Sequence, residues 1–386
     1  MNIPFIDLQA QQKRIIDRLR ENIDRVLSAG QYIMGPEVKE LEERLAAYCG
    51  TGHAIGCSSG TDALLMALMA CDVGPGDAVF TTPFTFVATA EVCALVGATP
   101  VFVDIDPVTF NIDTACLENA ICALEKADPG KYPLPEGYDK LRPRGIIAVD
   151  LFGQPADYKG LADIAAEHDL FVLEDAAQSF GASFNGAKAC SLADIAATSF
   201  FPAKPLGAYG DGGMVFTDDD NLAQRLESVR VHGKGMDKYN NVRIGINGRL
   251  DTMQAAILLA KFSIFSEEIE LRQQVADRYT RLLGPSSNIQ CPMVLDGMQS
   301  AWAQYSLLSP CRQEILQGLK EKGIPWAIYY PIPLHLQSGY TYLGYTKGSF
   351  PHAEQAAERI FSLPMHPYLD AETQEYIAAV IREASL

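Results

Sequence analysis

The 386-residue sequence lacks the features that mark membrane and secreted proteins. It contains no apolar run long enough to span a bilayer. Its first seven residues, from Met1 to Asp7, have neither the basic region nor the apolar region of a signal peptide. From these two absences we expect a protein of the cytoplasm with no membrane partner.

Positive charge is also scarce, because 31 Lys and Arg residues face 48 Asp and Glu residues, for a net charge of −17. An acidic protein repels phosphate backbones and anionic lipids, which argues against nucleic acid as a partner. The nine cysteines include no Cys-x-x-Cys pair, and the six histidines form no cluster with ligand spacing. We therefore expect reduced thiols and no metal site.

Short apolar runs alternate with helical patterns from about residue 50 to residue 217. This alternation predicts an α/β fold, with a mostly parallel sheet that has helices on both faces. A polar, Pro-rich stretch over 128–144 interrupts the pattern, and we expect it to be an exposed loop. The runs that predict strands are 78–80, 100–103, 145–149, 170–173 and 214–216.

The remaining pattern predicts helices around this sheet and a second, smaller domain. An amphipathic helix should end at Gly30, and Pro36 is suited to begin the next one. A long amphipathic helix over 251–283 should connect a large domain, 1–250, to a compact α/β C-terminal domain, 251–386. The chain is long enough for two such domains.

Lys204 is the first candidate for chemistry, because it lies in an apolar, Pro- and Gly-rich segment. Burial lowers the pKa of an amine and makes it a nucleophile that can form a Schiff base. The simpler interpretation is a lysine that extends to solvent from a turn, and this segment alone favours it.

Asp175 is the second candidate, at the end of the predicted strand 170–173. Open α/β sheets bind ligands beyond the carboxyl ends of their strands. A carboxylate there can pair with a protonated pyridine nitrogen, as a pyridoxal-phosphate enzyme requires. An Asp at a strand end also commonly caps the following helix, and the local sequence leaves both interpretations open.

Two further segments favour a cofactor site. Ser59, Gly60 and Thr61 precede an apolar helical pattern, and a helix start of this kind can bind an anion. Phe84 and Phe86 follow the predicted strand 78–80, and one of them could stack on a flat ring, although aromatics at strand ends more often belong to the core.

Together these segments resemble the DegT/DnrJ/StrS family of sugar aminotransferases, which are fold-type-I pyridoxal-phosphate enzymes. The resemblance extends from Phe5 to Pro367, with the segments in the family's order. It is strongest to members that aminate a UDP-linked 3-keto N-acetylglucosaminuronic acid. The segments 81–86, 200–207 and 330–335 carry that closer similarity. An enzyme that aminates a 4-keto-6-deoxy nucleotide sugar is the alternative within the family.

The resemblance implies roles for individual residues. Lys204 would bind the cofactor and act as base, and Asp175 would pair with the ring nitrogen. One departure is that Ala203 stands where members often have Ser or Thr before the lysine. The other cofactor-binding positions implied are Gly60, Thr61, Phe86, Gln178 and Ser199, with Asn247 reaching the phosphate of the neighbouring subunit in a homodimer.

For the substrates, the resemblance implies glutamate as amino donor and a UDP-keto-sugar as acceptor. Tyr329 and Tyr330 match a substrate-side segment, although either could instead pack the small domain. Arg249 belongs to a basic stretch that could bind the acidic sugar or form a solvated loop face, and we weigh these equally. That stretch comprises Arg230, His232, Lys234, Lys238, Arg243 and Arg249. Dehydratase relatives have His at the lysine position, so Lys204 argues against a dehydratase. Lys204, Asp175 and Gln178 together argue against a purely regulatory protein.

Overall fold

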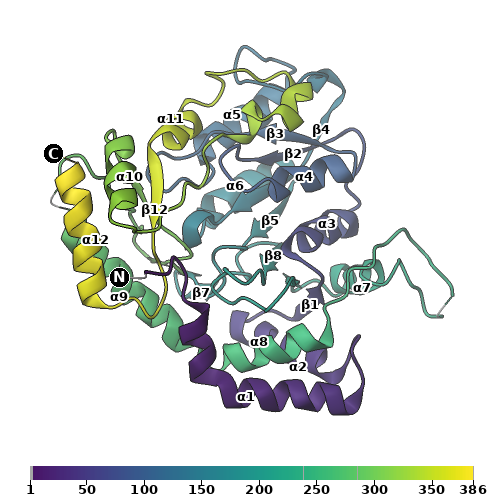
Figure 1. Cartoon of the computed structure of the whole chain (residues 1–386). Helices are drawn as coiled ribbons and strands as arrows, with labels where there is room; N and C mark the ends of the chain where they lie inside the picture. Colours follow the sequence, from purple (N-terminus) through teal and green to yellow (C-terminus); the bar gives the residue numbers. More distant parts are fainter. Residues whose placement is uncertain (1–2, 238, 285, 386) are drawn as a thin grey trace.

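The computed structural model describes residues 3–237, 239–284 and 286–385. Its centre is a seven-stranded sheet with the strand order β1-β9-β8-β5-β4-β2-β3 (Figure 1). Only β9 runs antiparallel to its neighbours. The strands are β1 His53–Cys57, β2 Asp77–Thr81, β3 Thr99–Phe102, β4 Arg142–Val149, β5 Phe171–Asp175, β8 Ile195–Ser199 and β9 Gly213–Thr217.

Helices cover both faces of this sheet. Alternate side chains of the strands pack on one side against α3, α4 and α7, and on the other against α2, α8, α5 and α6. The helices are α1 Leu8–Ala29, α2 Pro36–Cys49, α3 Gly60–Ala70, α4 Ala88–Leu95, α5 Thr114–Glu125, α6 Tyr158–His168, α7 Asp220–Val229, α8 Thr252–Phe262, α9 Phe265–Leu283, α10 Arg312–Glu321, α11 Pro351–Arg359 and α12 Ala371–Ala384.

The five strands predicted from apolar runs are confirmed, and so is the mostly parallel sheet. Helix α1 ends at Gly30, whose φ of 66° suits a glycine at a helix end, and Pro36 is the first residue of α2. Strands β1 and β8 are absent from the prediction. Both are built largely from small residues, such as Ala54, Gly56 and Ala196, so neither has the branched and aromatic composition typical of strands.

The single long helix predicted over 251–283 is wrong in one respect, because the structure has two helices there. Helix α8 ends at Phe262 and α9 begins at Phe265. Between them the Ser263 hydroxyl donates a 2.7 Å hydrogen bond to the Ala260 carbonyl. This bond gives the backbone an alternative to the helical pattern and favours the interruption. Helix α8 is buried over most of its surface, whereas α9 has one apolar face.

The C-terminal part forms a small α/β unit, as expected. Strands β11 Tyr305–Leu308 and β12 Ile360–Leu363 pair antiparallel, and α9, α10 and α12 pack with them around a second apolar core (Figure 1). A third sheet joins β6 Ser183–Phe184 to β7 Ala187–Lys188 and β10 Met298–Gln299. The domain boundary at residue 250 stays a prediction.

The predicted loop over 128–144 forms only one short 3-10 turn, η1 Tyr138–Lys140, before β4 begins at Arg142. It is less exposed than expected. The Asp104 amide donates a 2.8 Å hydrogen bond to the Tyr132 hydroxyl, and Tyr132 and Leu134 pack against the core. These apolar side chains hold the segment against the sheet.

The other 3-10 turns are η2 Leu151–Gly153, η3 Leu334–Leu336 and η4 Ser338–Leu343. No helix in the described part of the chain is long and apolar enough to cross a bilayer. All nine cysteines are free thiols.

Candidate active site

The candidate residues converge beyond the carboxyl ends of the central strands β5 and β8. Asp175 is the last residue of β5 and Ser199 the last residue of β8, and these strands are parallel neighbours. The loop that follows β8 carries Lys204 back toward Asp175, since the two groups interact electrostatically. The topology thus brings together residues that are far apart in the sequence.

Asp175 is buried, and both of its carboxylate oxygens accept hydrogen bonds. The Thr89 hydroxyl donates to Oδ2 at 2.8 Å, and the Ala177 amide donates to Oδ1 at 3.2 Å. Burial raises the pKa of Asp175, while these donors and the charge of Lys204 oppose the rise. No helix begins after β5, where the chain forms turns through Phe180. The alternative interpretation of Asp175 as a helix cap is therefore wrong.

Lys204 lies in a tight loop shaped by its neighbours. Its amide donates to the Phe201 carbonyl at 2.9 Å. A side chain at Gly207 would come within 2.5 Å of the Pro202 carbonyl oxygen, so the loop requires glycine there. Burial lowers the pKa of Lys204, and Asp175 opposes this effect. The Lys204 residue is half-buried, so its amine is neither fully enclosed nor fully solvated. This arrangement favours the nucleophilic interpretation over a lysine that extends to solvent.

The predicted anion site forms at the start of α3. Ser59 caps the helix by accepting a 3.0 Å hydrogen bond from the Asp62 amide. A Cβ atom at Gly60 would lie 2.5 Å from the Ser199 Cβ, so only glycine permits this close approach. Gly60 and Ser199 are therefore in contact, and Thr61 follows directly on the helix. Free amides at this helix start suit a phosphate group.

The two candidate aromatics, Phe84 and Phe86, differ in their exposure to solvent. Phe84 is fully buried and packs edge-on against Tyr330, with ring centroids 6.2 Å apart. Phe86 is 55% exposed. Phe84 is thus a core residue, and Phe86 is the ring free to stack on a cofactor.

Gln178 is buried at the inner wall of the site. Its Oε1 accepts from the Phe152 amide at 2.8 Å, and its Nε2 donates to the Tyr330 hydroxyl at 3.2 Å. This links the predicted cofactor neighbour to one of the two predicted substrate tyrosines. Tyr329 and Tyr330 are both half-buried, and burial raises the pKa of each phenol.

The basic stretch divides into residues with different surroundings. Arg230 is buried and donates to Glu42 at 2.5 Å and to the Gly56 carbonyl at 3.1 Å. The interpretation of Arg230 as an exposed or substrate-binding cation is therefore wrong, because Arg230 is buried and pairs with the half-buried carboxylate of Glu42. Lys238 lies outside the described residues.

Asn247 and Arg249 lie on the segment that follows this loop. Asn247 is exposed and accepts a 2.5 Å hydrogen bond from Arg249. The segment runs beside Cys57 and Ser58 of its own chain, where the Ser58 amide donates to the Gly248 carbonyl at 3.2 Å. The loop after α7 extends away from the body of the molecule (Figure 1).

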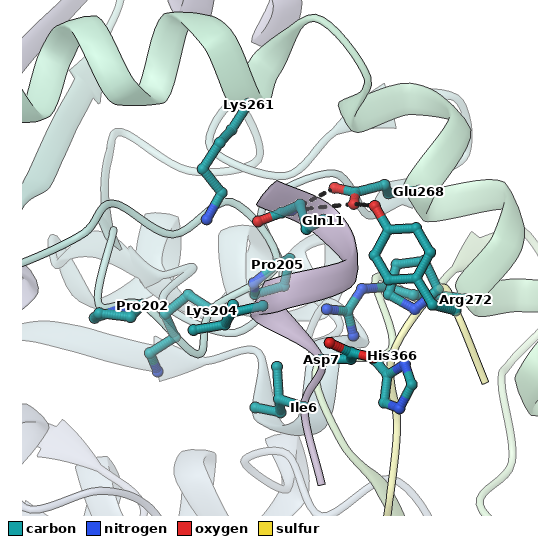
Figure 2. A pocket seen from close by; sticks show the side chains of 13 residues that line it. Ile6, Asp7, Gln11, Pro202, Lys204, Pro205, Lys261, Glu268, Arg272 and His366 are labelled. Atoms are coloured by element: carbon teal, nitrogen blue, oxygen red, sulfur yellow. Dashed lines mark hydrogen bonds between the residues drawn. The ribbon is translucent and has the colours of Figure 1, made fainter. Parts of the chain in front are cut away.

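Sequence reasoning missed two groups of residues around this site. Thr89, which donates to Asp175, is not among the residues that the sequence marks as candidates. Its hydroxyl contacts that of Thr85, which precedes α4, so no helical periodicity marks the pair in the sequence. A buried lysine, Lys261, lines a small cavity next to the Lys204 loop, together with Glu268 and Arg272 (Figure 2). Nothing in the local sequence marks this second cluster.

The residues fit pyridoxal phosphate, since the glycine at position 60 leaves space, Lys204 and Asp175 face each other and Phe86 is exposed. Among the described residues, no group of His, Cys, Asp or Glu side chains is arranged to hold a metal ion. The observation behind this fit is the space beside Gly60 and Ser199, which a Cβ atom at position 60 would fill.

Comparisons with known proteins identify the family of this chain. The model of the DegT/DnrJ/EryC1/StrS aminotransferase family matches residues 13–382. The UDP-2-acetamido-2-deoxy-3-oxo-D-glucuronate aminotransferase of Pseudomonas aeruginosa is 47% identical over 98% of this chain and 99% of its own. A crystal structure of a family aminotransferase from Brucella abortus is 49% identical, with a TM-score of 0.94 and 99% of each chain covered.

A further solved structure concerns the cofactor. NtdA from Bacillus subtilis, crystallised with bound cofactor PMP, is 27% identical with a TM-score of 0.86, over 99% of this chain and 85% of its own. The expected fold type and cofactor are confirmed by these similarities. The chain therefore belongs to the DegT/DnrJ/EryC1/StrS aminotransferase family and is a pyridoxal-phosphate-dependent sugar aminotransferase.

Proposed function

We propose that this protein transfers an amino group from glutamate to the 3-keto group of a UDP-linked N-acetylglucosaminuronic acid. The product would be an amino sugar nucleotide for surface polysaccharides such as the O-antigen of lipopolysaccharide. The observation that carries the choice of substrate is the 47% identity, over nearly the whole of both chains, to an aminotransferase that acts on UDP-2-acetamido-2-deoxy-3-oxo-D-glucuronate.

The chemistry follows from two residues of this chain. Pyridoxal phosphate supplies, when bound, an electron sink for the carbon that loses its proton. Lys204 would hold the cofactor as a nucleophile, and its amine would move the proton between the donor's α-carbon and the cofactor's C4′. The lowered pKa of Lys204 favours the neutral amine that this step requires. With the sugar ketone, Lys204 transfers the proton in the reverse direction.

Other residues orient the reacting groups. Asp175 keeps the ring nitrogen protonated through its negative charge. Gln178 would contact the ring hydroxyl of the bound cofactor, and Phe86 would stack on its ring. The amides at Gly60 and Thr61, with the Ser199 hydroxyl, hold the phosphate. Tyr329 and Tyr330 donate phenolic hydrogen bonds on the sugar side.

The site is completed across a homodimer in this proposal. Asn247 reaches the phosphate in the partner's site, and Arg249 binds an anionic group of the sugar. Exposed apolar side chains on the projecting loop support a covered interface, because Val242 and Ile244 are 55% and 84% exposed. A partner surface over this loop would remove both from water.

A transamination assay tests the proposed substrate. The enzyme, glutamate and a panel of UDP-ketosugars are combined, and the products are identified by mass. The proposal predicts preference for the 3-keto acid, and added salt should weaken that preference because screening reduces charge pairing. Preference for an uncharged 4-keto-6-deoxy sugar would contradict the substrate assignment and leave the aminotransferase assignment intact.

A further inference from the structure

Two buried threonines lie in a row behind the carboxylate of Asp175. Thr89 is 1% exposed and its hydroxyl donates to Asp175 Oδ2 at 2.8 Å. Thr85 is 2% exposed, and its hydroxyl oxygen lies 3.3 Å from that of Thr89. Thr89 belongs to the first turn of α4, and Thr85 precedes it by four residues.

The direction of these hydrogen bonds is fixed by the chemistry of the carboxylate. An ionised carboxylate only accepts hydrogen bonds, so the single Thr89 proton points at Asp175. The Thr89 oxygen is then an acceptor in its contact with Thr85, and the Thr85 hydroxyl must be the donor. The three side chains thus form a chain in which each bond strengthens the next.

We propose that Thr85 and Thr89 form a positioning relay that keeps Asp175 ionised and directs its carboxylate toward the ring nitrogen of the cofactor. The proposal rests on the role assigned above to Asp175. Neither threonine touches the cofactor in this account, and both act through Asp175.

The other groups around Asp175 supply few hydrogen-bond donors and little positive charge. Its remaining donor, the Ala177 amide, is more distant at 3.2 Å. The titratable groups that face it are Lys204 from the loop after β8, Tyr330 from the C-terminal part and Tyr158 from α6. Buried carboxyls lie below it at Asp150 and Glu174, and the Asp150 amide donates to the Asp175 carbonyl at 3.1 Å. Lys204 is thus the one cation facing Asp175 among the described residues.

The relay also connects two cofactor contacts. Thr89 donates its own amide to the Phe86 carbonyl at 3.4 Å, while its side chain binds Asp175. The segment that carries Phe86 is therefore fastened to the carboxylate of Asp175. Loss of the Thr89 hydroxyl should change the position and the protonation of the Asp175 carboxylate, which pairs with the ring nitrogen. The fold should be retained.

The test uses Thr89→Val, which keeps the shape and removes the hydroxyl. Thr89→Ser restores the hydroxyl, and Thr85→Val removes only the outer donor. Thr81→Val is the matched control, because Thr81 is equally buried and its hydroxyl donates to the Ile147 carbonyl at 3.0 Å, not to Asp175. Each variant is measured for the affinity of the apoprotein for pyridoxal phosphate, by fluorescence, and for the pH profile of kcat/KM.

Thr89→Val should weaken cofactor binding about 10-fold or more, since hydrogen bonds to charged groups are the strong ones. The acidic limb of its pH profile should move to higher pH, because the lost donor favoured the ionised carboxylate. Thr89→Ser should recover most of both effects, and Thr85→Val should show a smaller change in the same direction. Thr81→Val should show neither.

Unchanged affinity and an unchanged acidic limb in Thr89→Val would overturn the relay. Asp175→Asn separates this failure from failure of the proposed function. If Asp175→Asn is impaired while Thr89→Val is normal, only the relay is wrong. If Asp175→Asn is itself fully active, the role of Asp175 is wrong and the relay has no purpose.

Discussion

Lys204 and Lys261 lie beside one small cavity and differ in what surrounds them, because Lys261 is fully buried and Lys204 is half-buried. Burial lowers the pKa of Lys204 and also that of Lys261, the latter to about 8. Both contribute to the lining of one small cavity (Figure 2). A lowered pKa alone would therefore nominate both as nucleophiles.

The surroundings of Lys261 offer no place for a cofactor. The cavity that both lysines line holds about 10 Å³, which is room for one water molecule, so no cofactor fits between them. The carboxylate nearest to Lys261, Glu268, already accepts from Gln11 at 2.8 Å and from Tyr368. The ammonium lies 5.1 Å from the centre of the Tyr209 ring. Lys204 instead faces Asp175, close to the glycine-lined start of α3. Access and partners, more than burial, distinguish a catalytic lysine from a structural one.

The largest effect expected is from replacing each lysine by methionine, which keeps the length of the side chain. Lys204→Met should lower kcat by on the order of 10⁴-fold, because it removes both the nucleophile and the base. Lys261→Met should stay within a few fold of the parent enzyme. Steady-state kinetics with saturating cofactor measure both, and equal losses in the two variants would remove the distinction.

The carboxylates beside the two lysines sharpen the same comparison. Asp175→Asn should lower kcat by on the order of 10²-fold or more, since it removes the charge partner of the ring nitrogen. Glu268→Gln, next to the other lysine, should change kcat only slightly. Circular dichroism confirms that both variants fold. Normal turnover by Asp175→Asn would contradict its proposed role.

Mixing variants tests which subunit completes the site. When Lys204→Met and Asn247→Ala subunits exchange, about a quarter of all sites should be intact, because half of the dimers carry one native site. Activity should therefore recover above both parents, provided Asn247→Ala alone is strongly impaired. The control pairs Lys204→Met with Asp175→Asn, which lie in one site and should give no recovery. If the first mixture also fails despite demonstrated exchange, Asn247 serves its own subunit.

The smallest effect concerns stability. The folded pKa of Lys261 is lowered from 10.5 to about 8, so the unfolded chain binds more protons between these values. The free energy of unfolding should thus gain on the order of 3 kcal/mol from this group as pH rises from about 8 to 10.5. Urea denaturation of the apoprotein measures the gain, which Lys261→Met should lack. An identical pH dependence in the variant would show that Lys261 is not desolvated.

The two lysines also show which parts of the site can be predicted from the sequence. The segment around Lys204 is recognisable because its glycines and aromatics lie next to it in the chain. The cluster around Lys261 assembles from α1, α8, α9 and the segment near His366, so only the fold brings its members together. The same holds for the Thr89 contact with Asp175, which joins residues 86 positions apart.

The fold was predictable where strands have branched and aromatic residues, as in β4 and β5. It was not predictable in β1 and β8, where Ala and Gly lie in the sheet and tertiary packing overrides weak local propensity. The prediction for Arg230 was wrong for a related reason. Its charge indicated a surface, but its partner Glu42 lies 188 positions away and makes burial possible.

Borohydride reduction followed by peptide mapping tests the central claim directly, because it compares the two lysines in one sample. The holoenzyme is reduced so that the bond between cofactor and lysine becomes permanent, and its peptides are analysed by mass spectrometry. The account predicts the phosphopyridoxyl group on Lys204 and none on Lys261, with loss of the visible absorbance band. A modified Lys261, or an unmodified Lys204 in protein that has bound the cofactor, would contradict it.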